Sequence, residues 1–141
     1  MINRLYQQSE RLLIEELTKI AKQYQIPFHT DLTQAFGKIQ IDLSKSRIDY
    51  ATATAHKLGG PRGIGLLYVR EGTPFQPLIT GGKQERARRA GTETVTLAVG
   101  FANAVEWYLN NQSKLHEQFL RFRKSVLDKI AKLDGIFLNT D

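Results

Sequence analysis

One lysine, Lys57, stands where a side chain can be held against a ligand. It follows His56 at the end of an extended segment, and a glycine-rich run at 59–65 follows directly. A lysine amine becomes nucleophilic when desolvation or a neighbouring cation favours its neutral form, and it then forms a Schiff base with an aldehyde. Lys57 is therefore the candidate for covalent chemistry in this chain.

Other side chains could complete a site for an aldehyde cofactor. Asp31 follows a short extended segment, and ligands of open α/β sheets bind outside the carboxyl ends of the strands. Pyridoxal phosphate enzymes combine a lysine for the aldehyde with an acid for the pyridinium nitrogen. Thr54 and Thr92 are hydroxyl candidates for the phosphate, and Gln34 can hydrogen-bond a ring oxygen.

Each residue also has a purely structural interpretation. An aspartate after a strand is most often a turn residue or a helix cap. A single lysine is usually a solvated surface charge, and His56 could simply be packed or hydrogen-bonded. The glycine cluster could form only a hairpin turn, since it lacks the phosphate-loop pattern in which Gly-Lys-Ser/Thr follows four residues after a glycine.

The elements that would position these residues alternate between helix and strand. A helix is predicted at 9–25, with Ser9 as its N-cap and an apolar stripe at three- and four-residue spacing. Strands are predicted at 26–30, 47–54 and 64–69, and residues 34–38 form a turn. This order indicates an α/β architecture. The stripe consists of Leu13, Leu17, Ile20, Ala21 and Tyr24.

The remaining segments are predicted from turn residues and periodicity. Residues 39–43 are extended, and Asp42 or Ser44 caps a short helical turn after them. Residues 75–92 form an irregular loop, and loops of that length are usually functional or disordered. Two helices follow, at 94–109 and 114–133, the second capped by Ser113, and a strand begins at 135–139.

Composition narrows the possible partners. The 141 residues carry a net charge of +6, contain no cysteine, and show no apolar run near the ~18 residues of a membrane span. Disulfides, thiolate metal sites and a cysteine nucleophile from this chain are excluded. The basic excess is local, at 83–89 and 121–124, without a nucleic-acid motif. We expect a cytoplasmic protein with neither nucleic acid nor membrane as partner.

Three blocks of sequence, in order, resemble a known family. They are Phe-His-Thr-Asp-Leu-Thr-Gln-Ala-Phe-Gly-Lys-Ile (28–39), Ala-His-Lys-Leu-Gly-Gly-Pro-Arg-Gly-Ile-Gly (55–65) and Gln-Glu-Arg-Ala-Arg-Arg-Ala-Gly-Thr-Glu-Thr (84–94). Together they resemble the cysteine desulfurases of the NifS type, which are class V aminotransferase-like, fold-type I pyridoxal phosphate enzymes. The resemblance runs from about Glu15 to at least Leu109.

The resemblance implies a role for each candidate residue. Lys57 would be the lysine that carries the cofactor and moves the catalytic proton. The cofactor-binding set would be Asp31 at the pyridinium nitrogen, Gln34 at the ring hydroxyl oxygen, Thr54 and His56 at the phosphate, and Thr92 at the phosphate of the other subunit of a homodimer.

The resemblance also implies a fold and a reaction. The fold is the mostly parallel large domain of a fold-type I enzyme, partial at 1–92, followed at 93–141 by a connecting helix and the start of the C-terminal small domain. The reaction converts L-cysteine to L-alanine and passes sulfur to iron–sulfur cluster assembly. The family's ring-stacking histidine, substrate-binding arginine and persulfide cysteine are not in this sequence, so we expect a central fragment that is inactive alone. The alternatives are a non-enzymatic interaction module, or one half of a split enzyme that assembles with complementary desulfurase segments.

Overall fold

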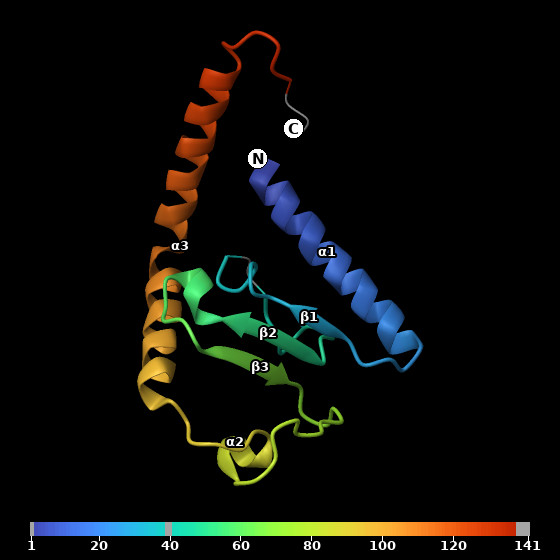
Figure 1. Cartoon of the computed structure of the whole chain (residues 1–141). Helices are drawn as coiled ribbons and strands as arrows, with labels where there is room; N and C mark the ends of the chain where they lie inside the picture. Colours follow the sequence, from blue (N-terminus) through green and yellow to red (C-terminus); the bar gives the residue numbers. More distant parts are fainter. Residues whose placement is uncertain (1, 39–40, 138–141) are drawn as a thin grey trace.

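The computed structural model describes residues 2–38 and 41–137, and Figure 1 shows their arrangement. The chain forms an α/β structure in which two long helices accompany a small sheet. The elements, in order, are α1 (Ile2–Gln23), β1 (His29–Asp31), β2 (Tyr50–Thr54), the 3-10 helix η1 (Ala55–Leu58), β3 (Gly65–Val69), α2 (Gln84–Ala87) and α3 (Val95–Ile130). The described helices do not include one that combines the length and the apolar composition of a membrane span.

The sheet has the strand order β1-β2-β3 and is mixed. β1 and β2 are parallel, with Asp31 opposite Thr52, whereas β2 and β3 are antiparallel, with Thr54 opposite Gly65. Connection length explains the difference, because a parallel crossover needs a dozen or more residues. The segment at 32–49 is long enough for one, and the segment at 55–64 is not.

The two faces of the sheet differ in character because successive side chains on a strand point to opposite sides. Ala51 and Ala53 are buried on one face, where Leu32 and Ile48 join them in the core and Ile14 of α1 packs against that core. The opposite face is exposed or half-exposed and mostly polar. It carries His29 and Asp31 of β1 together with Tyr50, Thr52 and Thr54 of β2.

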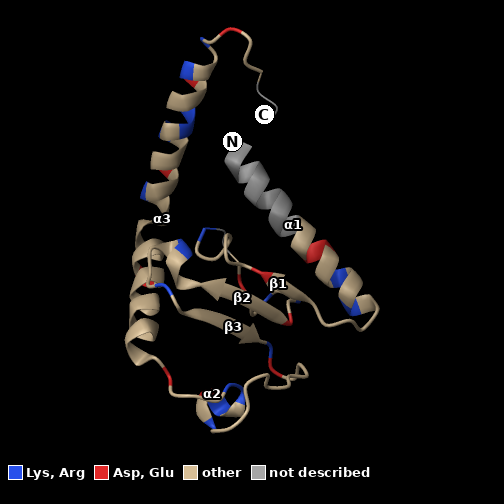
Figure 2. Ribbon diagram, viewed as in Figure 1, with Lys and Arg blue, Asp and Glu red and all other residues tan. Residues whose placement is uncertain are grey.

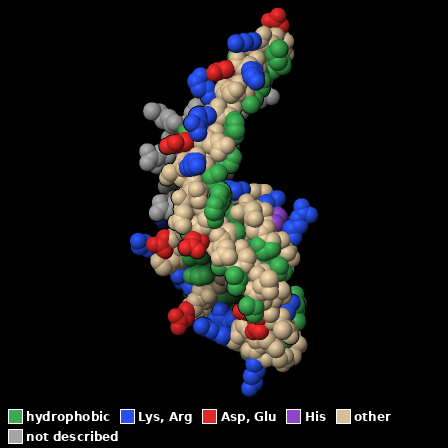
Figure 3. Space-filling model, turned by 90° about the vertical axis from the view of Figure 1, so that its left-hand side faces the viewer, with side chains coloured by type: hydrophobic (Ala, Val, Ile, Leu, Met, Phe, Trp, Pro, Cys, Tyr) green, Lys and Arg blue, Asp and Glu red, His purple; other side chains and the backbone are tan. Residues whose placement is uncertain are grey.

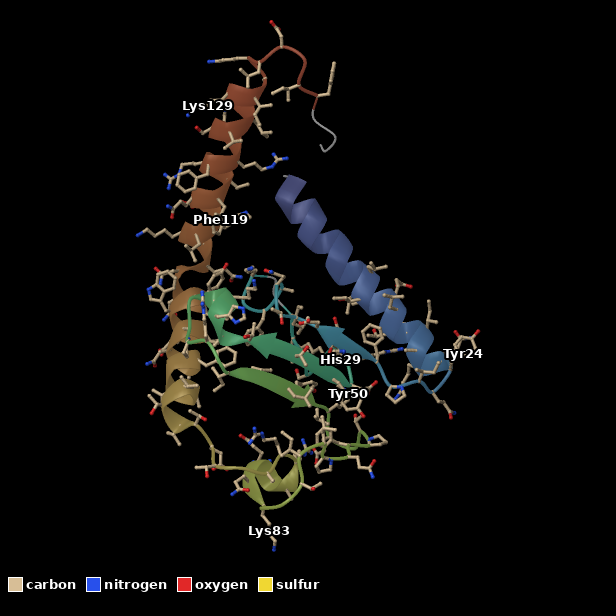
Figure 4. All side chains as sticks on the ribbon, viewed as in Figure 1. Tyr24, His29, Tyr50, Lys83, Phe119 and Lys129 are labelled. Atoms are coloured by element: carbon tan, nitrogen blue, oxygen red, sulfur yellow. The ribbon has the colours of Figure 1, made fainter. Side chains whose placement is uncertain are left out.

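Helix α1 covers the sheet less completely than its sequence predicted. The apolar stripe of Leu13, Leu17, Ile20 and Tyr24 remains 42–68% exposed, and Tyr24 lies at the far end of the helix in Figure 4. A helix of 22 residues is about 33 Å long, whereas strands of three to five residues span only about 10–17 Å. The helix therefore extends past the sheet, and Ile14 and Thr18 make the inward contacts.

Helix α3 is one continuous element, so the prediction of two helices is wrong. It runs through Ser113, which lies inside the helix and is not a cap. No glycine or proline interrupts the sequence from 101 to 134. The polar residues at the predicted break have partners that suit a helix. The Asn111 side chain donates to the Trp107 carbonyl at 2.8 Å, and Gln112 donates to the Gly37 carbonyl at 2.7 Å.

Other element boundaries also shift. α1 begins at Ile2, so Ser9 lies within it and is not its N-cap, and the helix ends two residues earlier than predicted. β1 and β2 start three residues later than predicted and β3 starts one residue later. Residues 135–137 form no strand, and 138–139 lie outside the described residues, as do 39–40 of the predicted extended segment. Asp42 is confirmed as the cap of a turn, because its Oδ1 accepts from the Ser44 amide at 3.0 Å.

The side chain of Arg70 fastens the loop before β2 to the end of β3. Its Nε donates to the Ile48 carbonyl at 2.9 Å, and its Nη2 donates to the carbonyls of Leu43 and Ser46 at 2.8 Å each. The guanidinium also lies 5.9 Å from the centre of the Tyr68 ring. One cation thereby satisfies three half-buried carbonyls on a segment that carries no regular structure of its own.

We predict that Arg70→Met lowers the free energy of unfolding by about 2 kcal/mol, because hydrogen bonds to a charged group contribute about 1.5–3 kcal/mol and the carbonyls lose their donor. Urea unfolding of the full chain measures this. Arg62→Met, at an exposed position, is the control and should change stability by less than about 0.5 kcal/mol. Equal effects of the two substitutions would contradict the role assigned to Arg70.

Candidate cofactor site

Five of the six predicted site residues lie at or just beyond the carboxyl ends of β1 and β2. Because the two strands are parallel and adjacent, their carboxyl ends meet at the same edge of the sheet. Asp31 ends β1, Gln34 follows in the next loop, and Thr54 ends β2. Figure 4 shows the polar face of these strands, with His29 and Tyr50 labelled on it. This edge is where open α/β sheets bind ligands.

The 3-10 helix η1 turns Lys57 outward. Ala55 and Leu58, at its two ends, are buried, whereas His56 and Lys57 between them are exposed. Gly59 ends the helix in the left-handed conformation at φ 79°, which a glycine adopts without a steric cost. The amine of Lys57 therefore stands free of the core, one turn beyond the end of β2.

Helix α3 supports this turn from behind. Leu58 packs with Phe101 of α3 in a shared cluster. A Cβ atom on Gly60 would lie 3.0 Å from the Cβ of Ala104 and 3.0 Å from the carbonyl oxygen of Ala55. Only glycine lets the backbone approach α3 this closely, so the glycine cluster does more than make a hairpin turn.

Thr54 and His56 form a polar pair beside Lys57. The Thr54 hydroxyl donates to the Ile64 carbonyl at 3.2 Å, and its oxygen lies 2.9 Å from Nδ1 of His56. A hydroxyl has one proton, so when that proton goes to Ile64 the imidazole donates its Nδ1–H to Thr54. The pair fixes the ring and directs Nε2 away from Thr54. A hydroxyl and an imidazole so placed are suitable for an anionic ligand such as a phosphate.

Asp31 is an ionised carboxylate at the end of β1. Hydrogen bonds from the Thr33 hydroxyl and from the Thr33 amide, 2.8 Å from Oδ1, hold the pKa of Asp31 below its ordinary value. The turn-residue interpretation of Asp31 is thus confirmed, because this amide contact is a local turn. A carboxylate that stays ionised is suitable for pairing with a cationic ring nitrogen.

Gln34 lies in a loop that α3 also holds. Its side-chain oxygen accepts from the Lys38 amine at 3.1 Å. Behind it, Gln112 binds the Gly37 carbonyl and Phe36 packs edge-on against Phe101, with ring centres 6.1 Å apart. Sequence reasoning missed Gln112, since a residue 75 positions away from Gly37 carries no local signal of this contact.

Thr92 is exposed in the segment between α2 and α3, well away from η1 in Figure 1. The fold does not bring it to the other five residues of this chain. This segment follows α2, where Glu85, Arg86 and Ala87 have positive φ angles of 48°, 56° and 62°. The basic residues of the segment gather around α2 in Figure 2. The role of Thr92 toward a second subunit stays a prediction.

A cavity of about 650 Å³ lies elsewhere, between β3 and α3. Its walls are mainly apolar, and none of the six predicted site residues contributes to them. Its lining includes Phe36, Leu66, Phe101, Val105 and Leu109. Leu66 is on the same side of the sheet as Ala53, its partner in the ladder. The cavity therefore opens on the apolar face of the sheet. Lys57 lies elsewhere, at the edge formed by the carboxyl ends of β1 and β2, which we call the polar edge.

The side chains at the polar edge match the chemical groups of pyridoxal phosphate. An outward lysine can meet the aldehyde, an ionised carboxylate on the neighbouring strand can meet the ring nitrogen, and a hydroxyl with an imidazole can meet the phosphate. The described residues include no group of three His, Asp or Glu side chains that could hold a metal ion. These residue types suit a pyridoxal phosphate site on an α/β fold.

Comparison with known proteins gives the family. The aminotransferase class-V pattern matches residues 11–141, and the chain belongs to that family. The chain is 40% identical over 127 residues to the cysteine desulfurase IscS of Dictyoglomus turgidum, a match that covers 89% of this chain and 32% of the relative.

Solved structures agree in fold. A NifS-like protein superposes with a TM-score of 0.80 at 37% identity, over 86% of this chain and 34% of the other. A structure described as SspA in complex with cysteine has a TM-score of 0.63 at 45% identity, over 66% of this chain and 27% of the other. The predicted resemblance to NifS-type desulfurases and the fold-type I class are confirmed. The chain spans about a third of the length of these relatives.

We predict that Gly60→Val lowers the Tm of the full chain by roughly 3–12 °C, because overpacking typically costs about 1–3 kcal/mol. The new side chain meets Ala104 and the backbone of Ala55, neither of which can swing aside. Thermal unfolding followed by circular dichroism measures the change. Ser113→Val, at an exposed position within α3, controls for introducing a branched side chain and should leave Tm nearly unchanged.

Proposed function

We propose that this chain forms the central, cofactor-binding part of a NifS-type cysteine desulfurase. The observation that carries the proposal is the placement of Lys57 and Asp31 at the carboxyl ends of adjacent parallel strands, in a chain of the class-V family. The substrate proposed is L-cysteine. The relatives named as cysteine desulfurases and the neighbour described as bound to cysteine support that choice.

The chemistry of each side chain would set its role in the site. Pyridoxal phosphate, when bound, supplies an electron sink that weakens bonds at the Cα atom of the amino acid. Lys57 would hold the aldehyde carbon and move a proton at the substrate Cα. Asp31 would face the ring nitrogen and Gln34 the ring oxygen, while Thr54 and His56 would bind the phosphate. Thr92 would bind the phosphate of the second subunit in a homodimer.

Sulfur transfer would need groups from outside these 141 residues. In the proposed reaction the C–S bond of cysteine breaks, sulfur passes to a thiolate to form a persulfide, and protonation of the remaining carbon skeleton leaves L-alanine. This sequence has no cysteine to receive the sulfur. We therefore propose that the chain acts only with complementary desulfurase segments. The assembled enzyme, and not this chain alone, would deliver sulfur to iron–sulfur cluster assembly.

The domain division is proposed on the same basis. Residues 1–92 would be part of the cofactor-binding large domain, and 93–141 would connect it to the start of the small domain. The course of α3 supports its role as the connecting helix. Its first half packs on η1, whereas its second half extends beyond the sheet in Figure 1.

We predict that pyridoxal phosphate marks Lys57 selectively, although weakly in the isolated chain. Borohydride reduction of the mixture, followed by peptide mass spectrometry, would place the pyridoxyl group on Lys57 in preference to the other lysines. The physical reason is that Asp31, Thr54 and His56 lie at the same edge of the sheet as Lys57, at or just beyond the carboxyl ends of β1 and β2. Lys57→Ala should remove the selective label.

Lys45→Ala is the matched control, since this exposed lysine lies in the loop before β2 and pairs with Asp42, at 3.3 Å. It should leave labelling of Lys57 unchanged. A label spread evenly over the surface lysines, and equal in the two variants, would contradict the proposed cofactor site. A strong stoichiometric label on the chain alone would contradict the need for complementary segments.

A second candidate function is an interaction module that assembles with a desulfurase chain. It is favoured by the apolar cavity of about 650 Å³ beside β3, an edge strand whose Leu66 and Leu67 are 37% and 48% exposed. Unpaired edges and open apolar surface favour association with another chain.

We predict that Leu66→Glu abolishes co-purification of this chain with a separately expressed desulfurase segment, because it places a charge in the apolar cavity. Lys57→Ala should not affect capture if assembly is independent of the cofactor. Capture that survives Leu66→Glu but is lost in Lys57→Ala would contradict the interaction-module function and favour a cofactor-dependent assembly.

A further inference from the structure

His29 and Thr52 lie beside the proposed cofactor site, next to Asp31. His29 and Asp31 are two positions apart on β1, so their side chains share the polar face of the sheet. Thr52 of β2 is the ladder partner of Asp31 on that face. The Thr52 hydroxyl lies 3.4 Å from Nε2 of His29, and Figure 4 shows His29 on β1 next to β2.

The hydrogen-bonding capacity of these groups gives the contacts a direction. An ionised carboxylate only accepts, and a threonine hydroxyl donates one proton while accepting at its oxygen. When the Thr52 proton is directed at Asp31, Nε2–H of His29 is the donor to Thr52. The chain of donors then runs from imidazole to hydroxyl to carboxylate, and each bond polarises the next.

The carboxylate of Asp31 also has independent local support. The Thr33 amide binds Oδ1 at 2.8 Å, and the Thr33 hydroxyl is the largest cause of the lowered pKa of Asp31. Thr52 and His29 act on the same carboxyl in the same direction. Of the titratable groups in the described part of the chain, His29 is the one that acts on Asp31 by its charge.

We propose that His29, acting through the Thr52 hydroxyl, is a positioning residue that holds the Asp31 carboxylate for a cationic ring nitrogen. This inference rests on the proposed function, because it assigns Asp31 to the pyridinium nitrogen. Thr33 fixes one side of the carboxylate from its own loop. Thr52 of the neighbouring strand and His29 of the same strand fix its other side, so that the orientation of the carboxylate depends on the sheet as well as on the loop.

The test is a carboxyl ¹³C NMR titration of Asp31 in the full chain without cofactor. Thr52→Val removes the hydroxyl at nearly constant shape and should raise the pKa of Asp31 toward its ordinary value. His29→Ala should also raise it, and the effect of His29→Ala should be smaller in the Thr52→Val background than in the native chain. Thr52→Ser should restore the native titration. Thr30→Val, on the opposite face of β1, should change nothing.

The outcomes separate this inference from the proposed function. An unchanged Asp31 titration in Thr52→Val, or an undiminished His29→Ala effect in the Thr52→Val background, would overturn the connection through the hydroxyl. With pyridoxal phosphate and borohydride, half-maximal labelling of Lys57 in His29→Ala should need about three to ten times more cofactor. Equal labelling in the two proteins would overturn the cofactor role of His29. If wild-type Lys57 is not labelled, the proposed function fails whatever the titration shows.

Discussion

The close approach of the glycine turn to the first half of α3 is the contact on which the candidate site depends. Gly60 allows the turn to touch Ala104, and Leu58 packs into the cluster of Phe101. Since the two ends of η1 are buried against the helix, the residues between them must face outward. The same helix holds the loop of Gln34 through Gln112 and the Gly37 carbonyl. One helix therefore positions two parts of the site that are far apart in sequence.

The sheet separates packing from chemistry by the alternation of its side chains. Alanines at 51 and 53 let the core residues approach one face closely, and the threonines at 52 and 54 stand on the other. Polar contacts then join neighbouring strands across that second face. The apolar face ends at β3 in an open cavity.

The far half of α3 also carries exposed apolar surface. Phe119, Phe122 and Val126 are 54–59% exposed along one side of the helix, where Figure 3 shows apolar side chains in a run flanked by basic ones. Figure 4 places Phe119 and Lys129 on this projecting part, beyond the sheet. The apolar periodicity of the sequence predicted that these residues share one side of the helix. It did not predict that this side is exposed. Periodicity records which residues share a face of a helix and says nothing of what covers that face.

The sequence by itself determined the α/β class, the family, and the candidate set around Lys57. Those features follow from local information, namely alternation, turn residues and short motifs whose chemistry is carried by residue type. The sequence predicted a mostly parallel sheet, whereas β3 returns antiparallel because the ten residues at 55–64 are too few for a parallel crossover.

Tertiary structure alone decided the rest. The continuity of α3 through Ser113, the hold of Gln112 on the Gln34 loop, the exposure of the α1 stripe and the neighbourhood of His29, Thr52 and Asp31 all depend on contacts between distant residues. Such contacts form only when the packing of the whole chain sets strand register and helix position, and no short stretch of sequence contains that information.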